Sequence, residues 1–186
     1  MRLLLARLRS RGRVVAEGRP LLGRGVRFDV APGARVVLGD GCRVGAGTRF
    51  HVAAGEVRVG PGASLGERCV ISAHERVAIG ERAVLGDEVV LIDFDHAIGD
   101  AERPVRLQGL VTGPIAIGAQ AVLDDAAMVL RGCEVGRGAH VVTRGVVTRD
   151  VAPGGLVEGV PARPPGEPAE AVSRPDARAP RPRGRG

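Results

Sequence analysis

Residues 38–49 read LGDGCR and then VGAGTR, and the same six-residue pattern returns at 59–70 (VGPGAS, LGERCV) and at 79–90 (IGERAV, LGDEVV). Each hexad opens with an aliphatic residue, Gly usually follows, and a small residue stands four positions after the opener. An amphipathic helix repeats its apolar residues about every 3.6 positions and a half-buried strand every second position, so neither produces a period of six. The pattern predicts a triangular coil of three short strands, with like residues stacked about 4.8 Å apart in successive coils.

The opening residues are expected to point into the prism, and the small residues to lie beside its corners. The openers are Leu38, Val44, Phe50, Val59, Leu65, Ile71, Ile79, Leu85, Leu91, Ile117, Leu123, Val129, Val135, Val141 and Val147. We therefore predict an all-β fold, a left-handed parallel β-helix, with about five full coils over residues 38–151 and an irregular coil around residues 22–37. Cys42, Cys69 and Cys133 all occupy the small inward position. Buried thiols are poor nucleophiles, so we expect them to be structural.

The repeat is interrupted at a few points. Openers advance by six residues, but by nine after Phe50, by eight after Ile71 and by twenty-six after Leu91. With three hexads per coil, each insertion falls at the same corner of the prism. The largest insertion predicts an external loop over about residues 95–114.

Polar residues gather on that edge. His51, His74 and His96 lie there, as do Glu75 and Asp95, two charged residues in the position normally held by a small one. Polar groups collected where a regular scaffold becomes irregular are typical of a functional site. Polar loops are also common without any function, and for His51 and His74 taken singly this second interpretation is favoured.

Three segments are expected. Residues 1–21 are predicted to be an N-terminal cap, residues 22–163 the β-helix, and residues 164–186, rich in Pro and Arg, a disordered tail. The opening MRLLLARLRSRGR has too short an apolar run for a signal peptide or a membrane span. Together with three cysteines, an odd number, this predicts a cytoplasmic protein.

The net charge of +6 does not by itself indicate a nucleic-acid partner. All 27 basic residues are Arg, and the only aromatic residues other than His are Phe28, Phe50 and Phe94. A binder of single strands is expected to have more stacking aromatic side chains. We therefore expect no nucleic acid among the partners.

Residues 91–100 (LIDFDHAIGD) and 108–163 resemble the hexapeptide-repeat acyltransferases, specifically the maltose, galactoside and exopolysaccharide O-acetyltransferase group. The specific parts are Asp-x-Asp-His before a long loop, a Gly-Pro-x-x-Ile-Gly restart, Val-Val-Thr-Arg-Asp-Val, and Gly-Val-Pro-Ala-Arg. The resemblance covers about residues 38–163. It implies an O-acetyltransferase with acetyl-CoA as co-substrate, a hydroxyl of a sugar or polysaccharide precursor as acceptor, and a homotrimer that holds coenzyme A between neighbouring prisms.

The resemblance also assigns individual residues. It implies that His96 is the general base and that five residues contact coenzyme A: Asp125, Thr143, Thr148, Arg149 and Arg163, the last at the nucleotide phosphates. Three positions depart from the family pattern: Val122 replaces a Trp, Arg144 lies in a bulkier version of Gly-Ala-Gly-Ser, and Gly166 replaces a second phosphate-binding Arg.

The chemistry of O-acyl transfer needs a base for the acceptor hydroxyl. Histidines change protonation near neutral pH, so His96 suits this task and can return the proton to the leaving thiolate. Asp93 or Asp95 could fix its tautomer, and the sequence does not decide between them. We expect His74, Asp93 and Asp95 to contact the acceptor.

Two other functions remain open at this stage. A β-helical carbonic anhydrase would need three histidines converging on zinc, and the spacing of His51, His74 and His96 disfavours this, so we expect no metal. A non-catalytic scaffold is the other alternative, because the donor groove departs from the family pattern.

Overall fold

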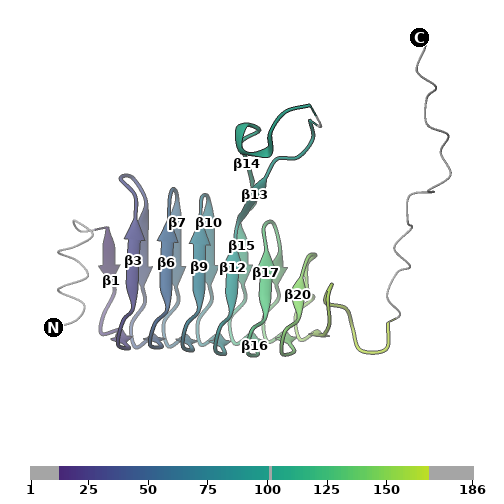
Figure 1. Ribbon diagram of the computed structural model, residues 1–186. Coiled ribbons are helices and arrows are strands. Elements are labelled where there is room, and N and C mark those ends of the chain that lie inside the picture. The colour runs from purple at the N-terminus through teal and green to yellow at the C-terminus, as the bar shows by residue number, and fades with distance from the viewer. Residues whose placement is uncertain (1–12, 101, 168–186) are drawn as a thin grey trace, which may run out of the picture.

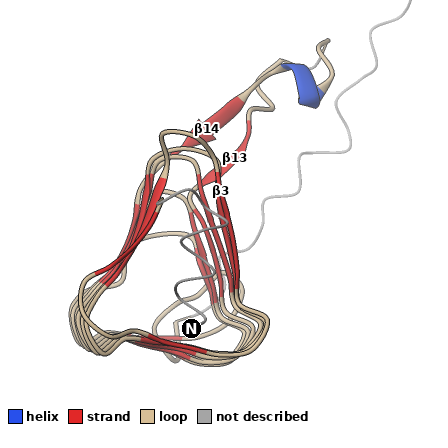
Figure 2. Ribbon diagram, turned by 90° about the vertical axis from the view of Figure 1, so that its left-hand side faces the viewer, coloured by secondary structure: helices blue, strands red, loops and turns tan. Residues whose placement is uncertain are grey.

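The structure is a computed structural model that describes residues 13–100 and 102–167, and these form a parallel β-helix of six coils (Figure 1). Each coil supplies one strand to each of three parallel sheets, the sides of a triangular prism, and one sheet gains a seventh strand, β21 (Leu156–Val157), after the last coil (Figure 2). The predicted all-β class, a parallel β-helix of hexapeptide repeats with an external loop, is confirmed.

The three sheets are named A, B and C here. Sheet A contains β1 (Val14–Ala16), β4 (Arg35–Leu38), β7 (Glu56–Val59), β10 (Arg76–Ile79), β15 (Ile115–Ile117) and β18 (Glu134–Val135). Sheet B contains β2 (Leu21–Leu22), β5 (Arg43–Val44), β8 (Ser64–Leu65), β11 (Val84–Leu85), β16 (Val122–Leu123), β19 (His140–Val141) and β21 (Leu156–Val157). Sheet C contains β3 (Arg27–Val30), β6 (Arg49–Val52), β9 (Val70–Ala73), β12 (Val90–Ile92), β17 (Met128–Leu130) and β20 (Val146–Val147).

The hexad openers form three buried ladders, one per sheet. In sheet A, for example, Leu38 pairs with Val59, and Ile79 pairs with Ile117 across the long insertion. Every predicted opener is buried. Because burying one aliphatic side chain stabilises a fold by roughly 1.5–3 kcal/mol, these ladders are the main source of stability.

The small inward positions are filled as predicted, and the three cysteines among them are buried and unpaired. Burial raises the pKa of the Cys42 thiol to about 11, with the Asp40 carboxylate adding to the effect. Burial also raises the pKa values of Cys69 and Cys133. Protonated, buried thiols are weak nucleophiles, in agreement with a structural role.

Glycine has two separate purposes in the hexad. A Cβ at Gly45, the second position, would lie 2.2 Å from the carbonyl oxygen of Gly66 in the next coil, so close stacking excludes a side chain. The left-handed backbone occurs instead two residues later, at Gly47 (φ 73°) and at Arg68 (φ 54°) in the same position of the next coil. Gly adopts this conformation at lower cost than Arg.

The β-helix begins earlier than predicted. β1 pairs with β4, and Ala16 lies opposite Leu38, so residues 14–21 belong to the first coil and not to a cap. This coil also continues regularly through β2 and β3 into sheets B and C, where an irregular one was expected. The small side chain of Ala16 occupies the opener position, which hides this hexad in the sequence.

The long insertion leaves the prism between sheets C and A, at the predicted corner. β13 (Phe94–His96) and β14 (Leu110–Thr112) pair antiparallel at its base, and a short 3-10 helix, η1 (Val105–Leu107), lies beyond them. We call residues 94–112 the arm. Figure 1 shows it projecting from the row of coils.

The predicted cap helix over residues 1–12 and most of the predicted tail, residues 168–186, lie outside the described residues. Residues 164–167 of that tail are described, and they lie against the last coil. In the part of the chain that is described, no helix has the length and apolar character needed to cross a membrane.

Candidate active site

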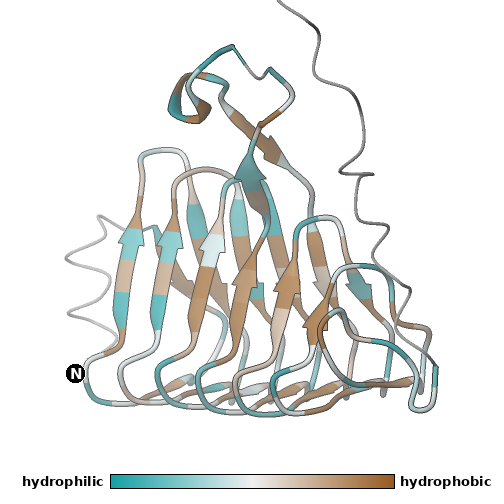
Figure 3. Cartoon of the chain, turned by 45° about the vertical axis from the view of Figure 1, so that its right-hand side comes forward, coloured by the Kyte–Doolittle hydropathy of each residue, from teal (hydrophilic) through white to brown (hydrophobic). Residues whose placement is uncertain are grey.

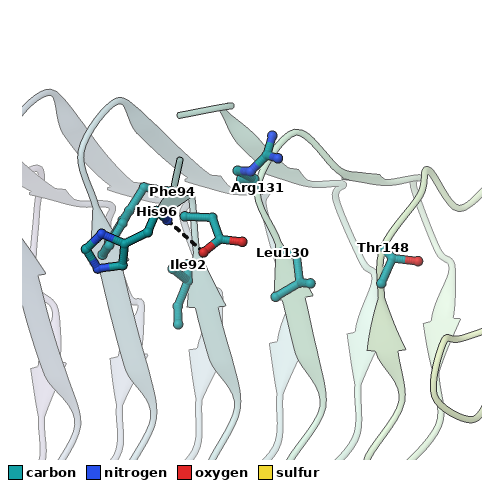
Figure 4. Close-up of a pocket in the computed structure, with 7 residues that line it drawn as sticks. Ile92, Phe94, His96, Leu130, Arg131 and Thr148 are labelled. Atoms are coloured by element: carbon teal, nitrogen blue, oxygen red, sulfur yellow. Dashed lines mark hydrogen bonds between the residues drawn. The ribbon is translucent and has the colours of Figure 1, made fainter. Parts of the chain in front are cut away.

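A cavity of about 480 Å³ lies on the outer side of sheet C, where the arm leaves the prism. It is lined by Ile92, Phe94, Asp95, His96, Leu130, Arg131 and Thr148. Ile92 pairs with Leu130 in the next coil, and Thr148 directly follows β20 in the coil after that. Figure 4 shows His96 and Thr148 at opposite ends of this row, with Arg131 beside Leu130. The structure thus brings together the predicted base and one predicted donor contact.

His96 is held at the base of the arm. It ends β13, where it pairs with Leu110, and its backbone N–H donates to Asp95 Oδ1 at 2.7 Å (Figure 4). Its side chain is exposed, and no described residue hydrogen-bonds to its imidazole ring. The ring is therefore available to a substrate in the cavity.

Asp93 is buried and does not line the cavity, whereas the sequence led us to expect a contact with the acceptor. Its side chain is 0% exposed, and its carboxylate faces the preceding coil. There Oδ1 accepts the backbone N–H of His74 at 2.7 Å, and Oδ2 accepts those of Glu75 and Arg76, both at 2.8 Å. With these three donors satisfied, Asp93 fixes the corner from which the arm departs and does not hold the His96 ring.

Asp95 and His74 take different positions. Asp95 is exposed and lines the cavity, although its Oδ1 accepts the His96 backbone N–H and not the ring. His74 is half-buried and does not line the cavity; its ring packs on Phe94 with centroids 4.2 Å apart. His74 is therefore connected to the cavity through its contact with Phe94, which does line it.

The remaining histidines are paired with carboxylates elsewhere. His51 Nδ1 lies 2.9 Å from Asp29 Oδ2, and His140 Nε2 lies 2.9 Å from Asp124 Oδ2. Among residues 13–100 and 102–167, no group of three or more His, Cys, Asp or Glu side chains is arranged to hold a metal ion. The zinc alternative gains no support from the positions of these histidines.

A second cavity, of about 430 Å³, lies at the C-terminal end of the β-helix. It is lined by Val142, Thr143, Glu158, Gly159, Val160, Pro161, Arg163, Pro164, Gly166 and Glu167. The segment that forms it runs beside β20: Val146 donates its N–H to Gly159, and Ala162 donates to Val146. Because Thr148 also follows β20, the two cavities flank the same strand. Thr143 and Arg163, predicted to contact coenzyme A, lie in the second one.

The two arginines predicted to contact coenzyme A share one carboxylate. Arg149 Nη2 lies 3.2 Å from Glu167 Oε1, and Arg163 Nη1 lies 3.5 Å from the same oxygen. The Arg163 side chain is only 12% exposed, and that of Glu167 is 39% exposed. The Glu167 carboxylate therefore lies where the two arginines converge.

Asp125 is one coil away from Thr143, since β16 and β19 pair in register. Its Oδ1 accepts the backbone N–H of Asp87 at 2.8 Å, and its carbonyl oxygen accepts that of Arg144 at 3.0 Å. These bonds join three successive coils at the corner between sheets B and C.

Sequence reasoning missed Arg131 and Glu167. Arg131 stands two residues after the opener Val129, the position that Asp93 holds after Leu91 and Arg149 after Val147. That position borders the interrupted edge in every coil, which is the signal that would have found Arg131. Glu167 lies beyond the last hexad, where the repeat gives no information.

No protein-family model matches the chain. It is 30% identical over 139 residues to a Mycobacterium tuberculosis protein named as a probable acetyltransferase, across 72% of this chain and 46% of that protein. It is 35% identical over 115 residues to nodulation protein L of Rhizobium meliloti, across 61% of this chain and 62% of that protein. The chain therefore spans less than two thirds of the length of either curated relative.

Three solved structures share the fold. A hexapeptide-repeat acetyltransferase of Vibrio cholerae, complexed with acetyl coenzyme A, matches 88% of this chain and 74% of its own at a TM-score of 0.59 and 18% identity. A maltose O-acetyltransferase of Clostridium difficile matches 83% of this chain and 70% of its own, at a TM-score of 0.55 and 20% identity. An N-acyltransferase of Bacillus cereus, in complex with dTDP and coenzyme A, matches 81% of this chain and 82% of its own, at a TM-score of 0.60 and 14% identity. The chain is thus similar, in sequence and in fold, to the hexapeptide-repeat acetyltransferases.

Proposed function

We propose that this protein transfers an acetyl group from acetyl-CoA to a hydroxyl of a saccharide, with His96 as the general base. The observation that carries the proposal is the shared cavity of His96 and Thr148, flanked across β20 by the cavity of Thr143 and Arg163. Sequence and fold similarity to acetyltransferases, one of them complexed with acetyl coenzyme A, support it.

The two cavities match the two ends of the donor. Coenzyme A carries its reactive thioester at one end of a long arm and its phosphates at the other. The thioester belongs in the first cavity, beside His96, and the phosphates belong near Arg163, whose guanidinium can donate to phosphate oxygens in fixed geometry. A donor in this position would run along β20.

The reaction is a direct transfer. The His96 imidazole takes the proton of the acceptor hydroxyl while the oxygen attacks the thioester carbonyl, and backbone N–H groups at coil turns stabilise the resulting oxyanion. The intermediate collapses with cleavage of the carbon–sulfur bond. The imidazolium then returns the proton to the departing thiolate. Alignment of the two substrates adds to the rate, since fixed geometry lowers barriers by up to roughly 7–11 kcal/mol.

A saccharide acceptor suits the first cavity, which combines the Phe94 ring with charged and hydroxyl side chains. The solved neighbours include one enzyme named for maltose and one N-acyltransferase bound to dTDP. The decisive experiment is a coenzyme A-release screen over sugars, nucleotide sugars and small amino compounds. If none of them caused release of coenzyme A, the protein would be better described as a non-catalytic scaffold. If only amines did so, the reaction would be transfer to nitrogen and not to oxygen.

The donor site yields a prediction of its own. Arg149→Ala and Arg163→Ala are each expected to raise the KM for acetyl-CoA about 10- to 100-fold with little change in kcat, because hydrogen bonds to charged groups contribute roughly 1.5–3 kcal/mol and these arginines are assigned to the phosphate end of the donor. Steady-state kinetics at saturating acceptor gives both constants.

Glu167→Gln is the matched control, with the opposite sign. Removing this carboxylate takes away an anion that competes with phosphate for both arginines, without loss of a cation. Coenzyme A should therefore bind about 2- to 30-fold more tightly, as expected if two partly exposed ion pairs worth roughly 0.2–1 kcal/mol each need no longer break. Unchanged donor affinity in all three variants would contradict this donor site.

We also propose that the protein is a homotrimer that meets through sheet C. The outward row Val70, Val90, Met128 and Val146 is aliphatic along four successive strands. Figure 3 shows the later strands of sheet C hydrophobic throughout, whereas β3 and β6 alternate. In a cyclic trimer one part of this face on each copy meets a different part on the next copy, and such heterologous contacts can close into a ring.

The expected solution mass is three times 19.2 kDa. Val90→Asp should shift it toward one copy, because a charge would be buried at the interface, whereas Val84→Asp on the outer side of sheet B should not. Light scattering coupled to size-exclusion chromatography measures both. A wild-type protein of monomer mass would exclude the trimer.

The three unpaired thiols are consistent with a reducing compartment such as the cytoplasm, where acetyl-CoA is available.

A further inference from the structure

We propose that the acceptor carries an anionic group, a carboxylate or a phosphate, and that Arg131 binds it. The inference rests on the proposed function and deepens it by naming the chemical class of the acceptor. Its basis is that Arg131 lines the same cavity as His96.

Arg131 forms no ion pair with any residue in the described ranges, and its side chain is exposed. The register explains why. Because Ile92 pairs with Leu130, the residue beside Arg131 in the preceding coil is Asp93, a natural partner for a guanidinium. The Asp93 carboxylate is turned away, however, and accepts three backbone N–H groups of the coil before. The acid in register with Arg131 is therefore already engaged, and the positive charge faces the cavity.

The other charged groups of the cavity do not neutralise Arg131. Asp95 also lines the cavity, and its Oδ1 accepts the His96 backbone N–H. It forms no ion pair with Arg131 within the described part of the chain. A guanidinium in this setting offers planar, paired N–H donors that match a carboxylate or a phosphate.

The position of Arg131 favours the acceptor over the donor. The thioester must lie beside His96 for the transfer to occur, and the phosphates of coenzyme A lie at the far end of that molecule. Arg149 and Arg163 stand toward that far end and converge on Glu167. Arg131 stands in register with Arg149, one coil before it. Unlike Arg149, it lines the cavity of His96 and is not one of the arginines paired with Glu167, so we assign the anion that it meets to the molecule whose hydroxyl reaches His96.

The rest of the cavity fits a sugar ring. Ile92, Phe94 and Leu130 supply an apolar wall against which a ring face can pack, and Thr148 supplies a hydroxyl at the far end. A volume of about 480 Å³ is in the usual range for small-molecule sites. The inferred acceptor therefore presents a hydroxyl to His96 and an acidic substituent to Arg131.

The test compares glucuronic acid and glucose 6-phosphate with neutral glucose, in wild type, Arg131→Gln and Arg131→Lys. We expect the wild type to use at least one anionic sugar better than glucose. Arg131→Gln should raise the KM for that sugar about 10- to 100-fold with little change in kcat, and should raise the KM for glucose much less. Arg131→Lys should recover part of the loss for the phosphate and less for the carboxylate, since lysine keeps the charge without the paired donors. Arg43→Gln, which removes an exposed charge from the outer side of sheet B, is the matched control and should change nothing.

Direct binding separates this inference from the proposed function. Calorimetric titration of each sugar into the coenzyme A-saturated protein needs no turnover. If an anionic sugar binds and Arg131→Gln weakens that binding, the Arg131 site is supported even if no sugar causes release of coenzyme A. In that case only the transferase proposal would fail. Coenzyme A release with glucose, but without a preference for either anion, would overturn the Arg131 site and leave the transferase proposal standing. Anion binding that Arg131→Gln does not alter, or no anion binding at all, would likewise overturn it.

Discussion

His96→Ala is expected to lower kcat by about 10²- to 10⁴-fold, the usual contribution of a positioned general base. The loss should appear at saturating acetyl-CoA and acceptor, because the imidazole accepts a proton in the transition state and does not contribute to the binding of either substrate. The His96 side chain is exposed and has no hydrogen bond from a described residue, so the variant should keep the melting temperature and the coenzyme A affinity of the wild type. Steady-state kinetics, thermal unfolding and calorimetry measure the three quantities.

The two other histidines of this edge provide controls. His74→Ala removes the ring that packs on Phe94, so it should weaken acceptor binding more than turnover. His51→Ala breaks only an exposed pair with Asp29, two coils before β12, and should have little effect. Near-normal turnover in His96→Ala would remove His96 from the mechanism, and a larger loss of kcat in His74→Ala would assign the base to the other histidine.

The sequence predicted the prism well because the repeat records packing inside it. Each opener must be apolar to fill the core, and Leu38, Ile79 and Ile117 stack as their spacing indicates. The prediction was wrong at the first coil, where Ala16 is too small to be recognised as an opener. The arm could not be predicted in detail, since residues outside the prism do not obey the rule that fixes the period.

The candidate site was predictable only in part, for the same reason. His96 and Thr148 came from motifs, and the structure adds that both line one cavity. Arg131 was missed because the same position in earlier coils holds the buried residues Val52, Ala73 and Asp93, so the repeat does not predict an exposed side chain there. Asp93 was assigned a contact with the acceptor, whereas it is buried. The motif identifies Asp93 as a notable residue. Only the pairing of coils reveals that its carboxylate accepts hydrogen bonds from the backbone N–H groups of residues 74–76.

Asp93→Ala is accordingly expected to lower the free energy of unfolding by about 2–4 kcal/mol, because each N–H left without an acceptor costs roughly 1–3 kcal/mol and water can reach part of this corner. For a chain of this length the melting temperature should fall by about 5–15 °C. Chemical and thermal unfolding measure the change.

Two further substitutions resolve which bonds matter. Asp93→Asn keeps one carbonyl oxygen, which can accept the N–H groups of Glu75 and Arg76 in place of Oδ2, but it turns an amide toward the N–H of His74. It should therefore cost about half as much as Asp93→Ala. Asp95→Asn alters an exposed carboxylate two residues away and should leave stability nearly unchanged. Because Asp93 anchors the corner from which β13 carries His96, both Asp93 variants should also lose turnover at temperatures where they remain folded. If Asp93→Ala were as stable as the wild type and only its acceptor KM rose, Asp93 would be an acceptor contact after all, and the three backbone bonds would not be what holds the arm in place.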